Sequence, residues 1–269
     1  MGRAQRRYGL EIHALVFLST HYHLLVTAAN AQQLARFVGY VNSNVAREIG
    51  RLTGWRDHFW GQRYQAILVS SEEAAQVSRL YYVLAQGVKE GLVLHPRDWP
   101  GPHCAAALVG EEELQGTWFD RSREYEAKRS KGGDQEARRF AERETVVLRP
   151  LPCWQDLDEA TRRANIREMV AAIVEQARVE RQGQPVLGVA ALQRQDPQSR
   201  APVVKRSPAP LIHAATRVVR EQYRRAYRLF DEAYQAASEA LRAGDRGARF
   251  PAGSFPCALP WVPLDKPTG

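Results

Sequence analysis

Hydrophobic and polar positions in the first third of the chain change period several times. Short apolar runs at 10–19 and 23–29 predict two neighbouring strands or one long bent strand, and a run at 64–69 predicts another. After Asn30, apolar residues recur at three- and four-residue spacing, which predicts an amphipathic helix over 31–52. These elements indicate a small layer of strands and helices.

A second helix is predicted from 72 to about 89. Ser70 is followed three residues later by Glu73, the spacing of a capping box, and Gly91 lies where the helix would stop. If Val77 is the zero of a helical wheel, Tyr82 and Gln86 fall on the side opposite the apolar face. They lie one turn apart, and Arg79 and Lys89 flank them on the predicted helix.

The pattern loosens after residue 95, where prolines predict a domain boundary. A charge-dense stretch at 120–145 predicts a helix broken by a loop, and helices are predicted at 158–182 and 211–243. A basic, proline-rich linker separates these two helices, and the C-terminal end is irregular. We therefore expect a catalytic-type domain over 1–105, a charged helical region with its linker over 106–210, and a basic helix with a tail over 211–269.

Composition narrows the class of protein. With 44% hydrophobic and 25% charged residues, the 269-residue chain is typical of a globular protein rather than a disordered one. Its net charge of +8 favours polyanions as partners, although a basic surface can also serve solubility alone. Three widely spaced cysteines support neither a disulfide framework nor a cysteine zinc site, and no apolar run is long enough for a bilayer. We expect a cytoplasmic protein without a membrane partner.

The segment "THYHLLV" at 20–26 contains the first candidate chemistry. Successive side chains of a strand alternate faces, so His21 and His23 point the same way, as two ligands of one ion must. Two histidines at a strand end are more often ordinary polar residues at a sheet edge, so the pair needs a third ligand and a reaction. Against such a metal, Gln86 would be an oxygen ligand and Tyr82 a nucleophile activated by nearby cations.

The motifs taken together resemble those of single-tyrosine transposases. "THYHLLV" looks like their His-hydrophobic-His motif, and "YVLAQGVKEGLV" from Tyr82 is similar to their tyrosine-helix motif. "FWGQRYQAILVSSEEAAQ" between them and "DWPG" after them resemble the branch associated with repetitive extragenic palindromes. The resemblance covers about residues 8–105.

The resemblance implies an α+β, ferredoxin-like antiparallel sheet with helices on one face, followed here by a mainly helical C-terminal region. It implies a tyrosine that attacks single-stranded or hairpin DNA, forms a 5′-phosphotyrosine link and leaves a 3′-hydroxyl. By position, Tyr82 would be the nucleophile, and His21, His23 and Gln86 would hold Mg²⁺ or Mn²⁺. Tyr81 is the weaker nucleophile candidate because it faces the predicted core. The resemblance also implies a monomer or a homodimer that exchanges the tyrosine helix.

The chain departs from the family in two places. Gln86-Gly87 stands where many relatives have Asn-Pro, and glutamine keeps an oxygen ligand. Relatives also have a further strand and helix before the strand that leads to the histidines, whereas about nine residues precede it here. Either the true start lies upstream of Met1, or the sheet lacks its first strand and exposes an edge.

Two further segments are candidate DNA contacts. "WRDHFWGQRY" interleaves aromatic and basic residues, a mixture found in single-strand binders, and Arg63 is its candidate phosphate contact. Its aromatic residues could equally well belong to the core. In the last predicted helix, an arginine stripe lies opposite an apolar face that we expect to pack on the protein; an ordinary solvated face is the alternative. With Arg79 and Lys89, the predicted DNA-binding residues include Arg217, Arg220, Arg224 and Arg228.

The leading interpretation is a metal-dependent DNA transposase or a domesticated relative. An inactive single-strand or hairpin-binding protein that retains the fold is the first alternative. A structural metal-binding regulator is disfavoured because no cysteine accompanies the histidines.

Overall fold

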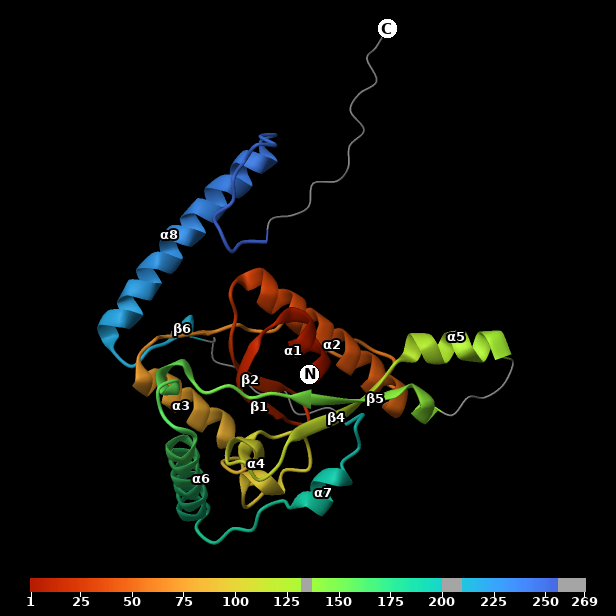
Figure 1. The fold of residues 1–269 in the computed structure, drawn as a ribbon. Coiled ribbons are helices and arrows are strands. Elements are labelled where there is room, and N and C mark those ends of the chain that lie inside the picture. The colour runs from red at the N-terminus through yellow and green to blue at the C-terminus, as the bar shows by residue number, and fades with distance from the viewer. Residues whose placement is uncertain (132–136, 200–209, 256–269) are drawn as a thin grey trace.

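The computed structural model describes residues 1–131, 137–199 and 210–255 (Figure 1). Most of the predicted proline-rich linker and the end of the tail lie outside these residues. The first elements are α1 (Gly2–Tyr8), β1 (Glu11–Phe17), β2 (Tyr22–Thr27), α2 (Ala31–Thr53), β3 (Leu68–Val69) and α3 (Glu73–Leu84). After them come α4 (Ala105–Leu108), β4 (Leu114–Phe119), α5 (Arg121–Lys131), β5 (Ala141–Val146), α6 (Glu159–Arg181), α7 (Val189–Gln193), β6 (Ile212–His213) and α8 (Arg217–Arg242).

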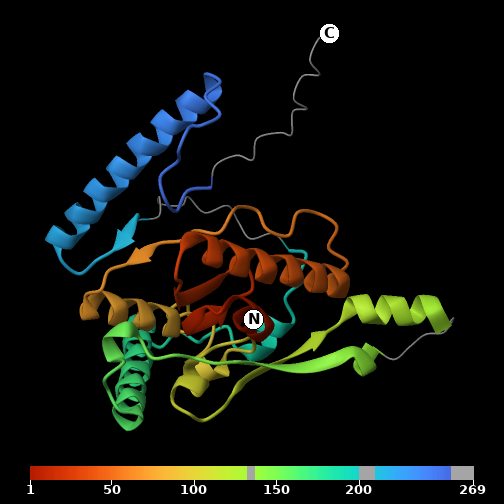
Figure 2. The same ribbon diagram turned by 45° about the horizontal axis from the view of Figure 1, so that its top comes forward.

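The antiparallel pair β1–β2 lies at the centre of the molecule between α2 and α3 (Figure 2). Tyr22 donates a hydrogen bond from its hydroxyl to Asn42 of α2, whereas the next residue, His23, has its ring against Tyr82 of α3. Because neighbouring residues of a strand point to opposite faces, the two helices cover opposite faces of the pair.

Other parts of the chain cover the outer edge of β1. Phe17 donates its backbone N–H to Pro102, Cys104 donates to Leu15, and Arg149 donates to Ile12. The predicted exposed edge is therefore not exposed. Segments from residues 102–104 and 148–149 take the hydrogen bonds that a further strand would take.

The stretch predicted as a broken helix at 120–145 is α-helical in its first part, as α5, whereas its end forms β5, which pairs with β4 in an antiparallel hairpin that has α5 near its tip (Figure 1). Helix α1 fixes this hairpin to the rest of the fold. Arg3 and Arg6 both bind the buried carboxylate of Glu144 on β5, and Arg3 also lies over the Trp118 ring of β4. Strands β4 and β5 are largely exposed, so their sequences are polar and lack the alternation of apolar and polar residues by which strands are predicted.

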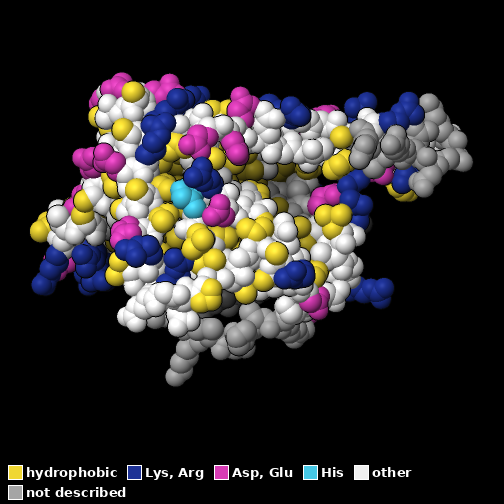
Figure 3. Space-filling view, turned by 90° about the horizontal axis from the view of Figure 1, so that it is seen from below, with side chains coloured by type: hydrophobic (Ala, Val, Ile, Leu, Met, Phe, Trp, Pro, Cys, Tyr) yellow, Lys and Arg dark blue, Asp and Glu magenta, His cyan; other side chains and the backbone are white. Residues whose placement is uncertain are grey.

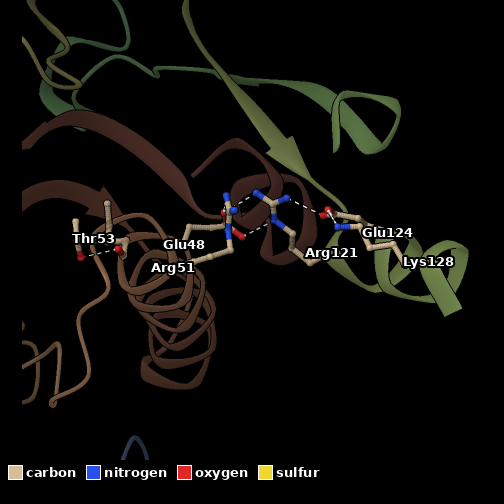
Figure 4. A network of polar contacts seen from close by, with 7 residues as sticks. Glu48, Arg51, Thr53, Arg121, Glu124 and Lys128 are labelled. Carbon is tan, nitrogen blue, oxygen red and sulfur yellow. Dashed lines mark hydrogen bonds and ion pairs between the residues drawn. The ribbon is translucent and has the colours of Figure 1, made fainter. Parts of the chain in front are cut away.

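A second ionic cluster joins α2 to the start of α5 (Figure 4). Arg121 donates through Nε and Nη2 to the two carboxylate oxygens of Glu48, at 2.9 and 2.8 Å, and through Nη1 to Glu124. The Arg121 hydrogen bond lowers the pKa of the Glu48 carboxyl. Such two-pronged contacts orient the hairpin against α2.

Long helices match the hydrophobic pattern best. Helix α2 begins after the predicted N-cap Asn30 and ends at Gly54, which adopts a left-handed conformation, and α6 follows its own N-cap Asp158. Helix α8 begins at Arg217, later than predicted, because residues 212–213 pair in parallel with β3. The predicted strand at 64–69 shrinks to Leu68–Val69.

The α+β class and the helical C-terminal region are confirmed. One cluster of buried apolar side chains runs from Ala4 to Leu192 within the described residues. The predicted domain limits near 105 and 210 stay predictions. Among the described residues, no helix is both long and apolar enough to cross a membrane.

Candidate active site

A tight turn and the start of β2 position the two histidines. The backbone of Leu18 donates to the carbonyl of His21, which closes the turn after β1. His23 then pairs with Val16 in the strand register. The two imidazole rings are edge to face with their centroids 4.9 Å apart, so they form one local pair as the His-x-His spacing predicts.

Helix α3 brings Tyr82 against this pair. The rings of His23 and Tyr82 are edge to face at 5.2 Å, and Tyr82 is 38% exposed. The Lys89 ammonium lies 3.8 Å from the centroid of the Tyr82 ring, and the Arg79 guanidinium lies 5.2 Å from it. The structure therefore brings a tyrosine, two histidines and two cations together on one surface.

Tyr81 occupies a different environment. Its hydroxyl donates to Gln176 of α6 at 2.6 Å, and its ring packs against the core. The neighbouring tyrosine thus serves the contact between α3 and α6, while Tyr82 faces the histidines. This division agrees with the weaker rank that the sequence gives Tyr81.

The imidazole of His23 has the properties of a metal ligand. Burial, with the nearby His21 and Lys89 charges, lowers its pKa to about 4, so the ring is neutral at physiological pH. Its Nε2 atom is buried and has no hydrogen-bond partner among the described residues. A buried nitrogen without a partner is costly unless something binds it, and a divalent ion fits this donor and the adjacent ring of His21.

Gln86 lies in a different place from the one the sequence predicts. Helix α3 ends at Leu84, not near Lys89, and the chain continues in turns through Gly87, whose φ is +83°. Gln86 is consequently 2% exposed rather than on the open face, and its amide nitrogen donates to the Tyr82 carbonyl at 2.9 Å. The helical wheel fails here because its period does not extend beyond the helix.

Gly87 has a physical reason to be glycine. A Cβ atom there would lie 3.1 Å from Cε3 of Trp99, in addition to the strain of a positive φ. The Trp99 indole donates in turn to the Phe17 carbonyl at the end of β1, at 2.7 Å. The turn that follows Tyr82 is therefore fastened to the strand that leads to the histidines.

The predicted capping box at the start of α3 is wrong. Glu72 is the N-cap residue, and it makes no side-chain cap to α3. Its carboxylate instead accepts hydrogen bonds from the Ser70 hydroxyl and from the backbone N–H groups of Ala215 and Thr216. Thr216 is the N-cap of α8, so the first residue before α3 also holds the beginning of α8.

His213 is a site neighbour that sequence reasoning missed. Its Nε2 lies 3.4 Å from Nη1 of Arg79, the same arginine that lies over the Tyr82 ring. Burial and the Arg79 charge lower the pKa of His213. No sequence signal marks this contact, because it depends on a two-residue parallel pairing between β3 and β6 across more than half of the chain.

The remaining predicted DNA contacts lie apart from Tyr82. Arg63 is exposed in the segment between α2 and β3, where the neighbouring Trp60 is partly buried and donates its indole N–H to the Asn42 carbonyl. The arginines of α8 lie on a helix that meets the rest of the fold at its N-terminal end; they are Arg217, Arg220, Arg224 and Arg228.

The Tyr82 side chain is 38% exposed beside its two cations. A groove of about 400 Å³ runs between α4 and α6, and its lining includes none of the residues around Tyr82. It lies on the face seen from below, where hydrophobic side chains gather between charged ones (Figure 3). An open surface suits a polymer strand that extends past the tyrosine better than a small molecule, which is usually enclosed.

The proposed metal site combines two histidines with an amide. The described residues contain no group of three or more His, Cys, Asp or Glu side chains that could hold an ion. The proposed set has two such residues, His21 and His23, and an amide as its third member. Its fit to a metal therefore rests on the neutral, partnerless nitrogen of His23 and the adjacent His21 ring.

Comparison with models of known protein families gives a match to the N-terminal part of the chain. Residues 1–86 match the family model described as "Transposase IS200 like", which includes the histidine turn, α3 and both Tyr82 and Gln86. Neither a curated protein nor a solved structure matches the chain significantly. The match covers the region in which the motifs and the geometry of the histidines and Tyr82 coincide, so residues 1–86 of this chain are similar to IS200-like transposases.

Proposed function

We propose that the chain cleaves and rejoins single-stranded DNA through Tyr82. The observation that carries the proposal is the continuous set of rings from His21 through His23 to Tyr82, with the Lys89 and Arg79 cations over the tyrosine ring. The two histidines, Tyr82 and Arg79 lie within residues 1–86, the region that matches the transposase family model. The first proposed partner is DNA, because the surface is open and carries cations at the reacting group.

In the proposed reaction, the Tyr82 hydroxyl oxygen attacks a backbone phosphorus. The new bond is a phosphotyrosine ester at the 5′ end, the bond between phosphorus and the 3′ oxygen breaks, and the proton lost by tyrosine balances the proton gained by the 3′-hydroxyl. The ester keeps the energy of the broken bond, so attack by a 3′-hydroxyl can rejoin strands. Lys89 and Arg79 would neutralise phosphate charge beside the tyrosine.

His21, His23 and Gln86 would hold the divalent metal, Mg²⁺ or Mn²⁺. The low pKa of His23 keeps its ring nitrogen available as a ligand at neutral pH. When bound, the metal would polarise the attacked phosphate. Gln86 also ties its own turn to the carbonyl of Tyr82, so the residue would keep the nucleophile and the ligand set in fixed relation.

Arg63 would contact phosphates of the bound DNA strand at a distance from the phosphate that Tyr82 attacks. It is exposed and belongs to the polar, aromatic segment before β3. A homodimer that exchanges α3 stays a prediction of the resemblance.

The test incubates the full chain with a panel of single-stranded hairpin oligonucleotides and Mn²⁺ and examines a denaturing gel for a covalent protein–DNA band. Tyr82→Phe should abolish the band, and chelation of the metal should abolish it in the parent chain. Tyr81→Phe is the matched control, because it removes the adjacent hydroxyl, and it should retain the band. A band that survives Tyr82→Phe, or a panel that gives no band while the chain binds DNA tightly, overturns the proposal; the second result favours the inactive binding protein.

A further inference from the structure

The two halves of helix α8 differ in charge. Residues 217–228 contain five arginines and one glutamate, whereas residues 229–241 contain three acidic residues and no lysine or arginine. The helix is thus strongly basic near its attachment to the fold and acidic farther away. In both ribbon views it rises from β6 away from the central strands (Figures 1 and 2).

The apolar face of this basic half is uncovered, contrary to the expectation that it packs on the protein. Tyr223 is 39% exposed and Tyr227 is 50% exposed. The far half is better covered, since Tyr234 contacts Phe250 of the returning chain and Ala237 is buried. The exposed aromatic rings and the basic charge therefore coincide in the same half of α8.

Helical geometry places these rings beside the arginines. Arg220 and Tyr223 are three residues apart, as are Arg224 and Tyr227, and residues at this spacing are neighbours on a helix surface. Tyr223 and Tyr227 consequently lie at the edge of the apolar face, where they border the arginine stripe over about one turn. Guanidinium groups that contact phosphates and aromatic rings that stack on bases are the two components of single-strand binding surfaces.

The base of α8 is fixed next to the tyrosine helix. Glu72, at the start of α3, accepts hydrogen bonds from Ala215 and Thr216 at 2.7 and 3.0 Å. His213, four residues before Arg217, contacts the Arg79 side chain that covers Tyr82. The Arg79 side chain over Tyr82 is therefore connected through His213 to the segment from which α8 begins.

From these observations we infer that the first half of α8 is a second single-stranded DNA-binding surface, which continues the strand path away from Tyr82. Phosphates lie along the stripe Arg217, Arg220, Arg224 and Arg228, and unpaired bases stack on Tyr223 and Tyr227. The inference rests on the proposed function for its choice of DNA. The five arginines of the basic half favour a polyanion as its occupant, and two copies that met through this half would repel each other.

The test measures equilibrium binding of a labelled, unstructured thymidine oligonucleotide over a series of salt concentrations. All proteins carry Tyr82→Phe and a chelator is present, so no cleavage enters the measurement. Replacement of the four stripe arginines by glutamine should reduce the magnitude of the slope of log K against log salt by about 3, or about 0.7 for each lost phosphate contact. The charge-matched control replaces four arginines elsewhere and should retain the slope: Arg163, Arg178, Arg194 and Arg242.

A second pair of variants tests base stacking. Tyr227→Leu should weaken binding about tenfold at fixed salt without changing the slope, because it removes a ring and no charge. Tyr125→Leu, at a tyrosine of α5 that is 66% exposed, should leave affinity unchanged. An unaltered slope in the stripe variant, or equal losses in the stripe and control variants, overturns the inference.

Sedimentation of the same proteins tests self-association. The inference predicts that Tyr223→Leu combined with Tyr227→Leu leaves the oligomeric state unchanged. Conversion of a dimer into a monomer by this double variant, with an unaltered salt slope in the stripe variant, assigns the face to a second copy and overturns the inference. Failure of the covalent-band test with a reduced salt slope contradicts the proposed function but not this surface, so the two failures are distinguishable.

Discussion

The tyrosine helix α3 and the basic helix α8 are held in opposite ways. Helix α3 buries Leu80, Val83 and Leu84, bonds to α6 through Tyr81, and is followed by a turn packed on Trp99. Helix α8 buries Ala237 alone among its described side chains and is tied to α3 at its first turn. The difference agrees with the proposed roles, because bond cleavage needs atoms in fixed positions, whereas a flexible strand can be bound along an exposed helix.

Substitution of one leucine in each helix tests whether α3 is packed more tightly than α8. Leu84 is fully buried, so Leu84→Ala should lower the free energy of unfolding by about 2–5 kcal/mol through lost burial and a cavity. Leu229 of α8 is 59% exposed, and Leu229→Ala should change it by less than about 0.5 kcal/mol. Urea unfolding measures both. Similar losses in the two variants would mean that α8 is packed as tightly as α3.

Substitution of His23 should affect activity but not stability. His23→Leu should lower the rate of covalent adduct formation at least about 100-fold, because it removes a proposed ligand. It should not lower the melting temperature, since it replaces a buried nitrogen that has no partner among the described residues.

His13 is the matched control for His23. Its two ring nitrogens contact the Arg149 carbonyl and the Thr27 hydroxyl, so His13→Leu leaves buried groups unpaired and should cost about 1–3 kcal/mol of stability. Retention of full activity by His23→Leu would contradict the ligand role.

A pH measurement examines how firmly the end of α3 and the edge of β1 are packed together. His103, which bridges to Val16 of β1, is 9% exposed, and burial lowers its pKa to about 4. The unfolded chain binds the proton near the ordinary value of about 6.5, so the unfolded state is favoured as pH falls below that value. The stabilising contribution is present above pH 6.5, and about 2 kcal/mol of it should be lost by pH 5.

Comparison with His103→Gln isolates this contribution. His23 has a similarly low pKa and loses stability in the same pH range in both proteins, so the difference between the two curves belongs to His103. The variant should show a shallower decline in unfolding free energy between pH 7 and pH 5. Parallel curves would mean that His103 is solvated.

The smallest effect concerns the turn after Tyr82. Gly87→Ala should destabilise the chain by about 1–2 kcal/mol for the positive φ, and further through the contact with Trp99. Gly183→Ala is the control, because Gly183 has the same φ of +83° and no atom within 4 Å of an added Cβ. Thermal unfolding should give Gly87→Ala a lower melting temperature than Gly183→Ala. Equal losses of stability in the two variants would show that the turn shifts to accommodate the added Cβ atom next to Trp99.

Sequence reasoning predicts the local parts of this molecule well. The cap Asn30, the end of α2 at Gly54 and the span of α6 follow from periodicity and capping, which are properties of neighbouring residues. The grouping of His21, His23 and Tyr82 follows from the motif spacing. Arg79 and Lys89 also flank the tyrosine as predicted.

Long-range pairings explain what the sequence does not reveal. The edge of β1 is completed by residues 102–104 and 148–149, which have no strand-like pattern. Glu72 is predicted as the first residue of the tyrosine helix, yet its side chain binds backbone groups at the start of α8, more than 140 residues later. Gln86 is buried rather than on the predicted open face, and it lies beyond the end of α3 at Leu84.

Locating the covalent bond between protein and DNA tests whether Tyr82 is the nucleophile. The protein–DNA adduct formed with Mn²⁺ can be digested with nuclease and trypsin, and cleavage after Arg79 and Lys89 yields a peptide that contains both Tyr81 and Tyr82. Fragmentation by mass spectrometry then distinguishes the two tyrosines. We predict a nucleotide mass on Tyr82; the same mass on Tyr81 or on any other residue would contradict the account.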